Sequence, residues 1–459
     1  MKKNFSIAAL ALFIAGGALF VNAQKGGQYE KDSNPKANRD RGLVLLGEIK
    51  SALKREYYDL GFRGIDIDAR FKTAEAQIKT EDMNWQIYRT IAQVLSELRD
   101  SHTAFVPPDR LFRVEYGFTT MLVGEKCYVT EVKKGSDAEA KGMQAGDEIV
   151  SFSNLSPGRT NYSKISYIIY SLDPQEELNL VIKALDGSTK QTVIRSKFIS
   201  PEQRIAERKK RKTEEQFKAV SCTELSPELI TCKVRTFEVE PEAFDKMMKV
   251  AGKYKKLLLD LRGNSGGYRD SLIHFLGYFF VDNVHAGNEI SRGKTRQRII
   301  DGKGENSFKG DLGVLIDSES ASASELFARI VQIQKRGTIY GDNSAGAVMV
   351  ARLYGLAIPL SRASVSAQTG MPYYTALVEI SVADIIMSDG KGLEGVGVAP
   401  DISILPTSMH ISKRWDPALS YSAIKLGHKL LPEDAGKLNF LIPKSEDQFD
   451  LDGAAADSK

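Results

Sequence analysis

The stretch KKLLLDLRGNSGG, residues 255–267, joins two signals that decide the fold. Its first half is a nearly continuous apolar run, which is typical of a strand buried on both faces of a sheet. The strand leads directly into a turn that contains Gly263, Gly266 and Gly267. Glycine lets the backbone turn sharply and approach a ligand closely, so this is either an ordinary tight turn or a binding loop. A phosphate loop is a weak alternative, because the Lys-Ser/Thr pair that should follow is absent.

A second junction of this kind is DSESASASELFARI, residues 317–330, where a turn precedes an apolar helix. Four serines alternate in it: Ser318, Ser320, Ser322 and Ser324. Ser322 and Glu325 have the spacing of a capping box, so one interpretation is that Ser322 simply caps the helix. The other is that Ser322 is a nucleophile, with the unpaired backbone N–H of Ala323 available to a developing oxyanion.

Both junctions lie in a region that alternates strand and helix patterns. Further strands are predicted at LGVLI (312–316), GTIYG (337–341) and ALVEISVA (376–383), and helices at DSLIHFLGYFF (270–280) and ELFARIVQI (325–333). Alternation of this kind predicts an α/β core, which we assign to residues 221–442. An acidic tail is expected at 443–459.

Three segments are predicted between the N-terminal region and this core. Residues 41–112 have apolar residues at three-to-four spacing up to paired prolines, which predicts a helical domain. Residues 113–200 combine strand-like runs with a short helix closed by Gly142, and they resemble a PDZ domain of bacterial proteases, a module that binds extended peptide ends by strand addition. Residues 201–220 are densely charged, either as a solvated connector or as a basic patch for an anionic partner.

The N-terminus resembles a secretory signal. Lys2 and Lys3 precede an apolar run that ends near Phe20, and small residues lead to a cleavage site after Ala23. The run is shorter than the roughly 20 residues that a membrane span needs, although an uncleaved anchor is the alternative. Residues 1–23 are therefore expected to be removed and residues 24–40 to be a disordered linker. The mature chain is expected to be exported to the periplasm or the extracellular space, without a membrane span.

The charge balance and the cysteine content argue against some classes of function. The chain has 63 basic and 59 acidic residues, a balance that argues against a nucleic-acid partner. Export permits disulfides, and Cys222 and Cys232 flank a stretch that could form a hairpin, so a bridge between them is one outcome. Cys127 is left over, and no cysteine spacing suggests a metal site. No cofactor or metal is expected.

Several motifs together resemble the C-terminal processing peptidase and tricorn-core family of serine proteases. They are LLLDLRGNSGG (257–267), SASASE (320–325), GTIYGDNSAGA (337–347) and LEGVGVAPDI (393–402). The resemblance extends from about residue 41 to 405 and includes LRDSHT (98–103). It implies a ClpP/crotonase-like α/β protease core, an N-terminal helical domain and an inserted PDZ-like, β-rich domain.

The resemblance also implies roles for individual residues. Ser322 corresponds to the nucleophile, but the lysine base of the processing peptidases is replaced by Ala347. The tricorn-like branch instead uses a histidine preceded by serine and a glutamate before Gly-Val-x-Pro-Asp. Here these correspond to His102, Ser101 and Glu394.

The expected mechanism is acyl transfer to Ser322, with His102 as base and acid and with Glu394, helped by Ser101, orienting the imidazole. The oxyanion donors are expected to be the N–H groups of Ala323 and of Gly266 or Gly267. The expected function is an exported serine endopeptidase or processing peptidase that acts on peptides or unfolded proteins. The PDZ-like domain would recruit or gate them, and a homo-oligomer is left open.

Two alternatives remain open: an inactive relative that only binds peptides, favoured by the missing lysine, and a non-proteolytic hydrolase with the same triad.

Overall fold

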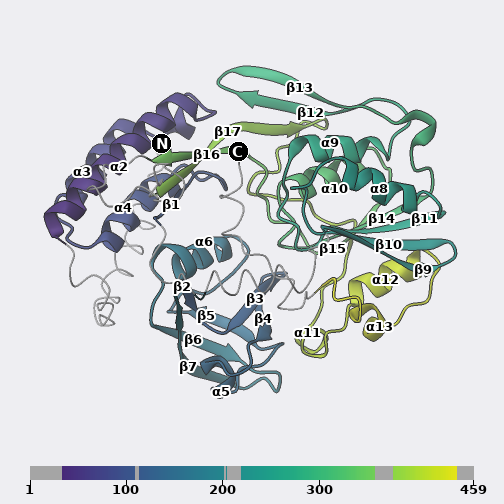
Figure 1. The fold of residues 1–459 in the computed structure, drawn as a ribbon, viewed down its shortest axis with the longest axis horizontal. Helices are drawn as coiled ribbons and strands as arrows, with labels where there is room; N and C mark the ends of the chain where they lie inside the picture. Colours follow the sequence, from purple (N-terminus) through teal and green to yellow (C-terminus); the bar gives the residue numbers. More distant parts are fainter. Residues whose placement is uncertain (1–33, 109–112, 201–202, 204–218, 357–375, 442–459) are drawn as a thin grey trace, which may run out of the picture.

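The computed structural model describes residues 34–108, 113–200, 203, 219–356 and 376–441 (Figure 1). The predicted signal peptide at 1–23 and the acidic tail at 443–459 lie outside these residues, as do most of the predicted linker and connector. Within the described residues, no helix combines the length and apolar character that crossing a bilayer requires.

The N-terminal region is helical, as predicted, but it begins earlier. Its elements are α2 (Pro35–Glu56), η2 (Phe62–Gly64), α3 (Ile67–Ile78) and α4 (Asn84–Ser96). The predicted linker to residue 40 is wrong for its last residues, because α2 starts at Pro35. The side chain of Asn34 caps this polar first turn by accepting from the N–H groups of Lys36 and Ala37. Buried Asn38 also anchors the turn, because its amide donates to the carbonyl of Asp82.

These helices cover one face of a five-stranded sheet, called the second sheet below (Figure 1). The helices and this sheet share one apolar core. The sheet contains β1 (Ala104–Val106), β16 (Val350–Leu356), β17 (Ala376–Met387) and the hairpin of β12 (Val284–Ser291) and β13 (Lys294–Ile300). The long strand β17 pairs with β1 and β16 at one end and with β12 at the other. It therefore ties the helical region to the α/β core.

Residues 113–200 form a β-rich unit with its own core. A five-stranded antiparallel sheet has the order β3 (Phe118–Val123), β4 (Lys126–Val132), β5 (Glu148–Phe152), β6 (Glu177–Lys183) and β7 (Thr189–Arg195). The remaining elements are β2 (Arg113–Glu115), β8 (Lys197–Ile199), α5 (Asp137–Ala140), α6 (Tyr162–Tyr167) and η3 (Ile168–Leu172). The predicted strand at Glu148–Phe152 and the short helix before Gly142 are both present.

The α/β core is built on a six-stranded sheet in the order β18 (Ile402–Ser403), β15 (Thr338–Gly341), β14 (Asp311–Ile316), β11 (Lys256–Asp260), β10 (Leu229–Val234) and β9 (Val220–Ser226). Its neighbouring strands are parallel except for the β9–β10 hairpin.

Helices cover both faces of this sheet (Figure 1). On one face lie α8 (Glu242–Ala251), α9 (Arg269–Gly277) and α10 (Ala323–Ile333); on the other lie α12 (Pro417–Lys425) and α13 (Pro432–Gly436). The short elements η4 (Gly304–Asn306) and α11 (Ser408–Lys413) complete the described structure.

The apolar run of β11 reflects this double coverage. Leu257 and Leu259 face the α8–α10 layer, whereas Leu258 faces the α12 layer, and all three are fully buried. Each buried leucine contributes about 1.5–3 kcal/mol to folding. At the end of the strand, Arg262 forms buried ion pairs with Asp260 and Asp416, which fix the start of the glycine turn against α12.

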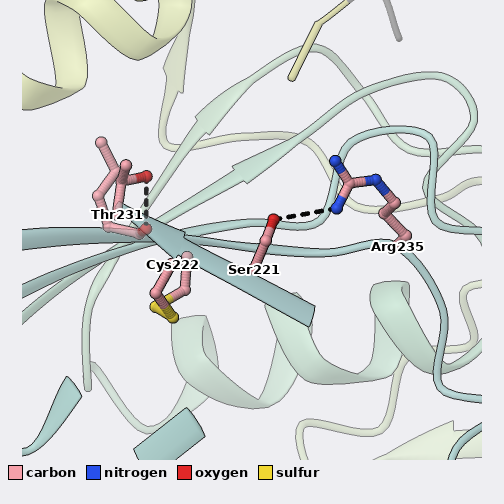
Figure 2. Close-up of a disulfide and its surroundings, with 6 residues drawn as sticks. Ser221, Cys222, Thr231 and Arg235 are labelled. Carbon is pink, nitrogen blue, oxygen red and sulfur yellow. Dashed lines mark hydrogen bonds between the residues drawn. A yellow bond between two sulfur atoms is a disulfide. The ribbon is translucent and has the colours of Figure 1, made fainter. Parts of the chain in front are cut away.

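A disulfide joins Cys222 and Cys232, the outcome that the hairpin pattern left open (Figure 2). The two residues lie directly opposite each other on β9 and β10, with their Cα atoms 4.1 Å apart. Arg235 donates to the hydroxyl of Ser221, and Thr231 donates to the carbonyl of Leu258 on β11. The disulfide thus joins the two strands of the edge hairpin, and the bond from Thr231 attaches the hairpin to the neighbouring parallel strand β11. Cys127 is a buried free thiol.

Candidate active site

The four serines in the turn between β14 and α10 differ in the hydrogen bonds of their hydroxyl groups. Ser318 donates to the carbonyl of Leu122, Ser320 to that of Leu261 and Ser324 to that of Asn264. The hydroxyl of Ser322 makes no such bond within the described residues, and it does not cap the helix. Only Ser322 therefore keeps its oxygen free for chemistry.

The backbone of Ser322 is strained. Its φ of 52° and ψ of −113° lie in a region that a residue with a side chain rarely adopts, at a cost of about 1–3 kcal/mol. Gly266 permits this conformation, because a Cβ there would lie 2.8 Å from the Cβ of Ser322. The glycine turn predicted from the sequence is thus packed directly against the candidate nucleophile.

Glu325 fixes the strained turn from inside the protein. Its fully buried carboxylate accepts the N–H of Ser322 at 3.0 Å, which is the second half of the predicted capping box. The same carboxylate accepts from the hydroxyl of Ser344 and from the N–H groups of Gly346 and Ala347. Burial raises its pKa, and these four hydrogen bonds oppose the rise.

The glycine turn also has internal hydrogen bonds that decide which N–H groups are free. The N–H of Gly266 donates to Oδ1 of Asn264 at 2.9 Å, so it is already used. This corrects the expectation that Gly266 can serve as an oxyanion donor. No hydrogen bond from the N–H of Gly267 or of Ala323 occurs within the described residues. These two groups remain available for that role.

The turn that carries Ser101 and His102 is held by Asp100. One oxygen of this carboxylate accepts the N–H groups of His102 and Thr103 and the hydroxyl of Ser381 on β17. The other oxygen accepts the hydroxyl of buried Tyr57 at the end of α2. The helical region and the second sheet thus position the candidate base jointly.

Ser101 connects His102 to Glu394. Its hydroxyl lies 2.6 Å from Nδ1 of His102 and 3.0 Å from Oε2 of Glu394. Its N–H donates to the other oxygen of Glu394 at 2.6 Å. Adjacent Ser101 and His102 therefore form one hydrogen-bonded chain with Glu394, which lies 293 positions after Ser101 in the sequence.

One peptide unit connects this chain to Ser322. The N–H of Val348 donates to Glu394 at 3.0 Å, and the carbonyl of the preceding Ala347 accepts from the N–H of Ser322 at 2.8 Å. In the described residues no hydrogen bond joins the hydroxyl of Ser322 to the ring of His102. Catalytic contacts are often long in the absence of substrate and tighten when it binds.

Burial perturbs both titratable members of the site. It lowers the pKa of His102, against the opposing charge of Asp100. It raises the pKa of Glu394, against hydrogen bonds from Val348 and Ser101 that favour the carboxylate. A neutral histidine near physiological pH is the form that a general base requires.

Sequence comparison provides the family. Residues 231–404 match Peptidase family S41. Residues 231–404 form a family S41 peptidase domain. With this domain the chain is a serine-type peptidase, a hydrolase. The matched segment contains the glycine turn, Ser322 and Glu394, whereas Ser101 and His102 lie before it.

Among curated relatives, this chain is 26% identical over 403 residues to "C-terminal processing peptidase, chloroplastic" of Tetradesmus obliquus, which covers 80% of this chain and 79% of the relative. It is 24% identical over 365 residues to "Carboxyl-terminal-processing peptidase 2, chloroplastic" of Arabidopsis thaliana, with coverage of 74% and 68%. Among solved structures, mature CPAF superposes with a TM-score of 0.62 at 13% identity, covering 82% of this chain and 94% of that one. That likeness concerns the fold.

The sequence did not reveal three contributors to the candidate site. Asp100 could have been found from its place just before Ser-His, where aspartate often accepts local N–H groups. Glu325 was seen only as part of a cap, and its burial has no sequence signal. The peptide unit between Ala347 and Val348 acts through its backbone, which composition does not reveal. Among the residues with described positions, no group of three or more His, Cys, Asp or Glu side chains could hold a metal ion.

Proposed function

We propose that this chain is an exported serine endopeptidase or processing peptidase that uses Ser322, His102, Ser101 and Glu394. The observation that carries the proposal is the hydroxyl of Ser101 between Nδ1 of His102 and the carboxylate of Glu394. This bond holds the imidazole with its other nitrogen, Nε2, available to take a proton.

The proposed mechanism begins when Nε2 of His102 removes the proton from Ser322 and the serine oxygen attacks the scissile carbonyl. The oxyanion is stabilised by the N–H groups of Ala323 and Gly267. His102 then protonates the leaving amine, and the same steps with water release the acyl group. Because Ser322 and His102 are not hydrogen-bonded without substrate, this mechanism includes a small closure of the site on binding.

The β-rich unit is proposed to recruit or gate peptide substrates as a PDZ-like domain. Its contact with the core supports the coupling. Ser318, near the nucleophile, donates to a carbonyl of β3, the edge strand of that unit. Arg159 of the same unit also pairs with Asp342 of the core at 2.9 Å. A peptide added to this edge would lie beside the nucleophile turn.

The experiment is labelling of the mature protein by a fluorophosphonate probe, with the labelled residue identified by mass spectrometry. Labelling is expected at Ser322 and should disappear in Ser322→Ala. Ser318→Ala is the matched control from the same turn, and in this variant Ser322 should still be labelled. Labelling at another serine would contradict the proposal.

A second candidate function is a peptide-binding relative without catalysis. Ala347 favours it, because the lysine that serves as base in the processing peptidases is missing there. Absent labelling of Ser322 together with tight binding of peptides would select this function. Hydrolysis of small esters without hydrolysis of peptides would instead indicate a non-proteolytic hydrolase.

A further inference from the structure

The carboxyl group of Glu379 on β17 has no partner among the described residues. It is half-buried, and no hydrogen bond or ion pair to it occurs within the described residues. Burial, and secondarily the charge of Asp100, raise its pKa to about 7, and no cation among the described residues opposes this rise. Burying a carboxylate without a counter-ion is costly, so a position of this kind is suited to a cation that arrives with a ligand.

The register of the sheet shows which way Glu379 faces. Glu379 lies between Ala104 of β1 and Leu353 of β16, and directly opposed residues share one face. The next residues along, Phe105 and Val378, belong to the apolar core under the helices. Glu379 therefore lies on the opposite face, away from the helical region.

The candidate base lies close to Glu379. His102 precedes Ala104, the directly paired partner of Glu379, by two residues. Beyond β1 the two segments are joined by side-chain bonds, since the N–H of Ser381 donates to the hydroxyl oxygen of Thr103 and its hydroxyl donates to the carboxylate of Asp100. Because Glu379 is paired directly with Ala104, the backbone of His102 lies within two residues of chain from that pair.

The surroundings of Glu379 fit a long cationic side chain. Leu353, directly beside it, is 53% exposed, and Val106, on the same face of β1, is 38% exposed. Lysine and arginine place an apolar stem against such residues and keep the charge at the tip. A carboxylate beside exposed apolar groups therefore matches both parts of these side chains.

We propose that Glu379 is a specificity-determining residue, whose carboxylate binds a lysine or arginine within about three residues of the scissile bond. This inference rests on the proposed function, because it takes His102 to mark the reacting centre. The substrate class that it names is peptides with a basic residue close to the cleavage position.

The test measures binding in the Ser322→Ala background, so that it does not depend on turnover. Fluorescent hexapeptide pools are prepared in which one position is fixed as Lys, Leu or Glu and the other positions are mixed. The protein is titrated into each pool at pH 8.5, where the carboxyl of Glu379 is ionised, and binding is measured by fluorescence anisotropy. The lysine pool is expected to bind roughly 10- to 100-fold more tightly than the leucine pool at one or two adjacent positions. Glu379→Gln should abolish this difference, and Glu379→Lys should favour the glutamate pool.

Asp384→Asn is the matched control, an acidic residue of the same strand that accepts only its neighbour's N–H. It should keep the preference for lysine. Equal binding of the three pools to the parent protein, or a lysine preference that survives Glu379→Gln, would overturn the inference.

Cleavage of the same pools by the active protein separates this result from the proposed function. Cleavage of peptides that lack a nearby basic residue would contradict only the role of Glu379 in specificity. Lysine-selective binding without any cleavage would sink the peptidase mechanism and leave Glu379 as a binding residue.

Discussion

Replacing Ser101 by alanine tests the hydrogen-bonded chain behind Ser322 in isolation. The change removes the hydroxyl that lies 2.6 Å from Nδ1 of His102 and 3.0 Å from Glu394. It leaves Glu394 in place, because the backbone N–H groups of residue 101 and of Val348 still donate to it. The variant therefore removes the orientation of the imidazole without removing the carboxylate.

The expected magnitude follows from the bond that is lost. A hydrogen bond to a charged group contributes about 1.5–3 kcal/mol, and about 1.4 kcal/mol corresponds to tenfold in rate. Since the imidazolium forms only during the reaction, kcat should fall roughly 10- to 150-fold while KM changes little. Water can enter the vacated space because Ser101 is exposed, so the lower part of this range is expected.

The assay is hydrolysis of a fluorogenic peptide together with the second-order rate of fluorophosphonate labelling. Ser101→Thr keeps a hydroxyl and should restore most of the activity, whereas a merely steric role would make threonine the worse substitution. The melting temperature should be unchanged in both variants. A kcat of Ser101→Ala within twofold of the parent value would refute the role of this bond.

The remaining predictions concern pH, the disulfide and the buried acid. Because burial lowers the pKa of His102, the neutral base persists as pH falls, and kcat/KM should stay constant from pH 8 to below the ordinary histidine value of about 6.5 before it is lost; a loss of activity that begins above about pH 6.5 would contradict a buried His102 as the base. Replacing Cys222 and Cys232 by alanine should lower the free energy of unfolding by roughly 2–3 kcal/mol, measured with denaturant, without changing kcat; an equal loss of activity would contradict the separation of hairpin and site. Glu325→Gln places an amide against four donors and should cost about 1–3 kcal/mol of stability and slow the labelling of Ser322; unaltered labelling would show that Glu325 does not hold the turn.

Much of the core could be predicted from the sequence because its signals are local. The apolar run at 257–259 is continuous because helices cover both faces of the parallel sheet. The hairpin of β9 and β10 was one outcome that Cys222 and Cys232 allowed, and the structure shows it. The first turn of α2 was missed because its residues are polar, and its stability comes from the Asn34 cap and the contact of Asn38 with Asp82.

The resemblance predicted residue types for the candidate site but not all of its hydrogen bonds. The resemblance selected Ser101, His102 and Glu394, and the hydrogen bonds among them agree with that grouping. The direction of a peptide N–H depends on a few backbone angles, which is why the bond from Gly266 to Asn264 could not be foreseen. The burial of Glu325 arises from packing between distant segments and likewise leaves no local pattern.

The most direct measurement is the rate of fluorophosphonate labelling of Ser322 in His102→Ala, compared with His285→Ala, a histidine on the exposed hairpin of β12 and β13. An imidazole that activates Ser322 predicts a loss of at least about 100-fold in His102→Ala and no change in His285→Ala. Equal labelling rates in the two variants would contradict the assignment of His102 as the base.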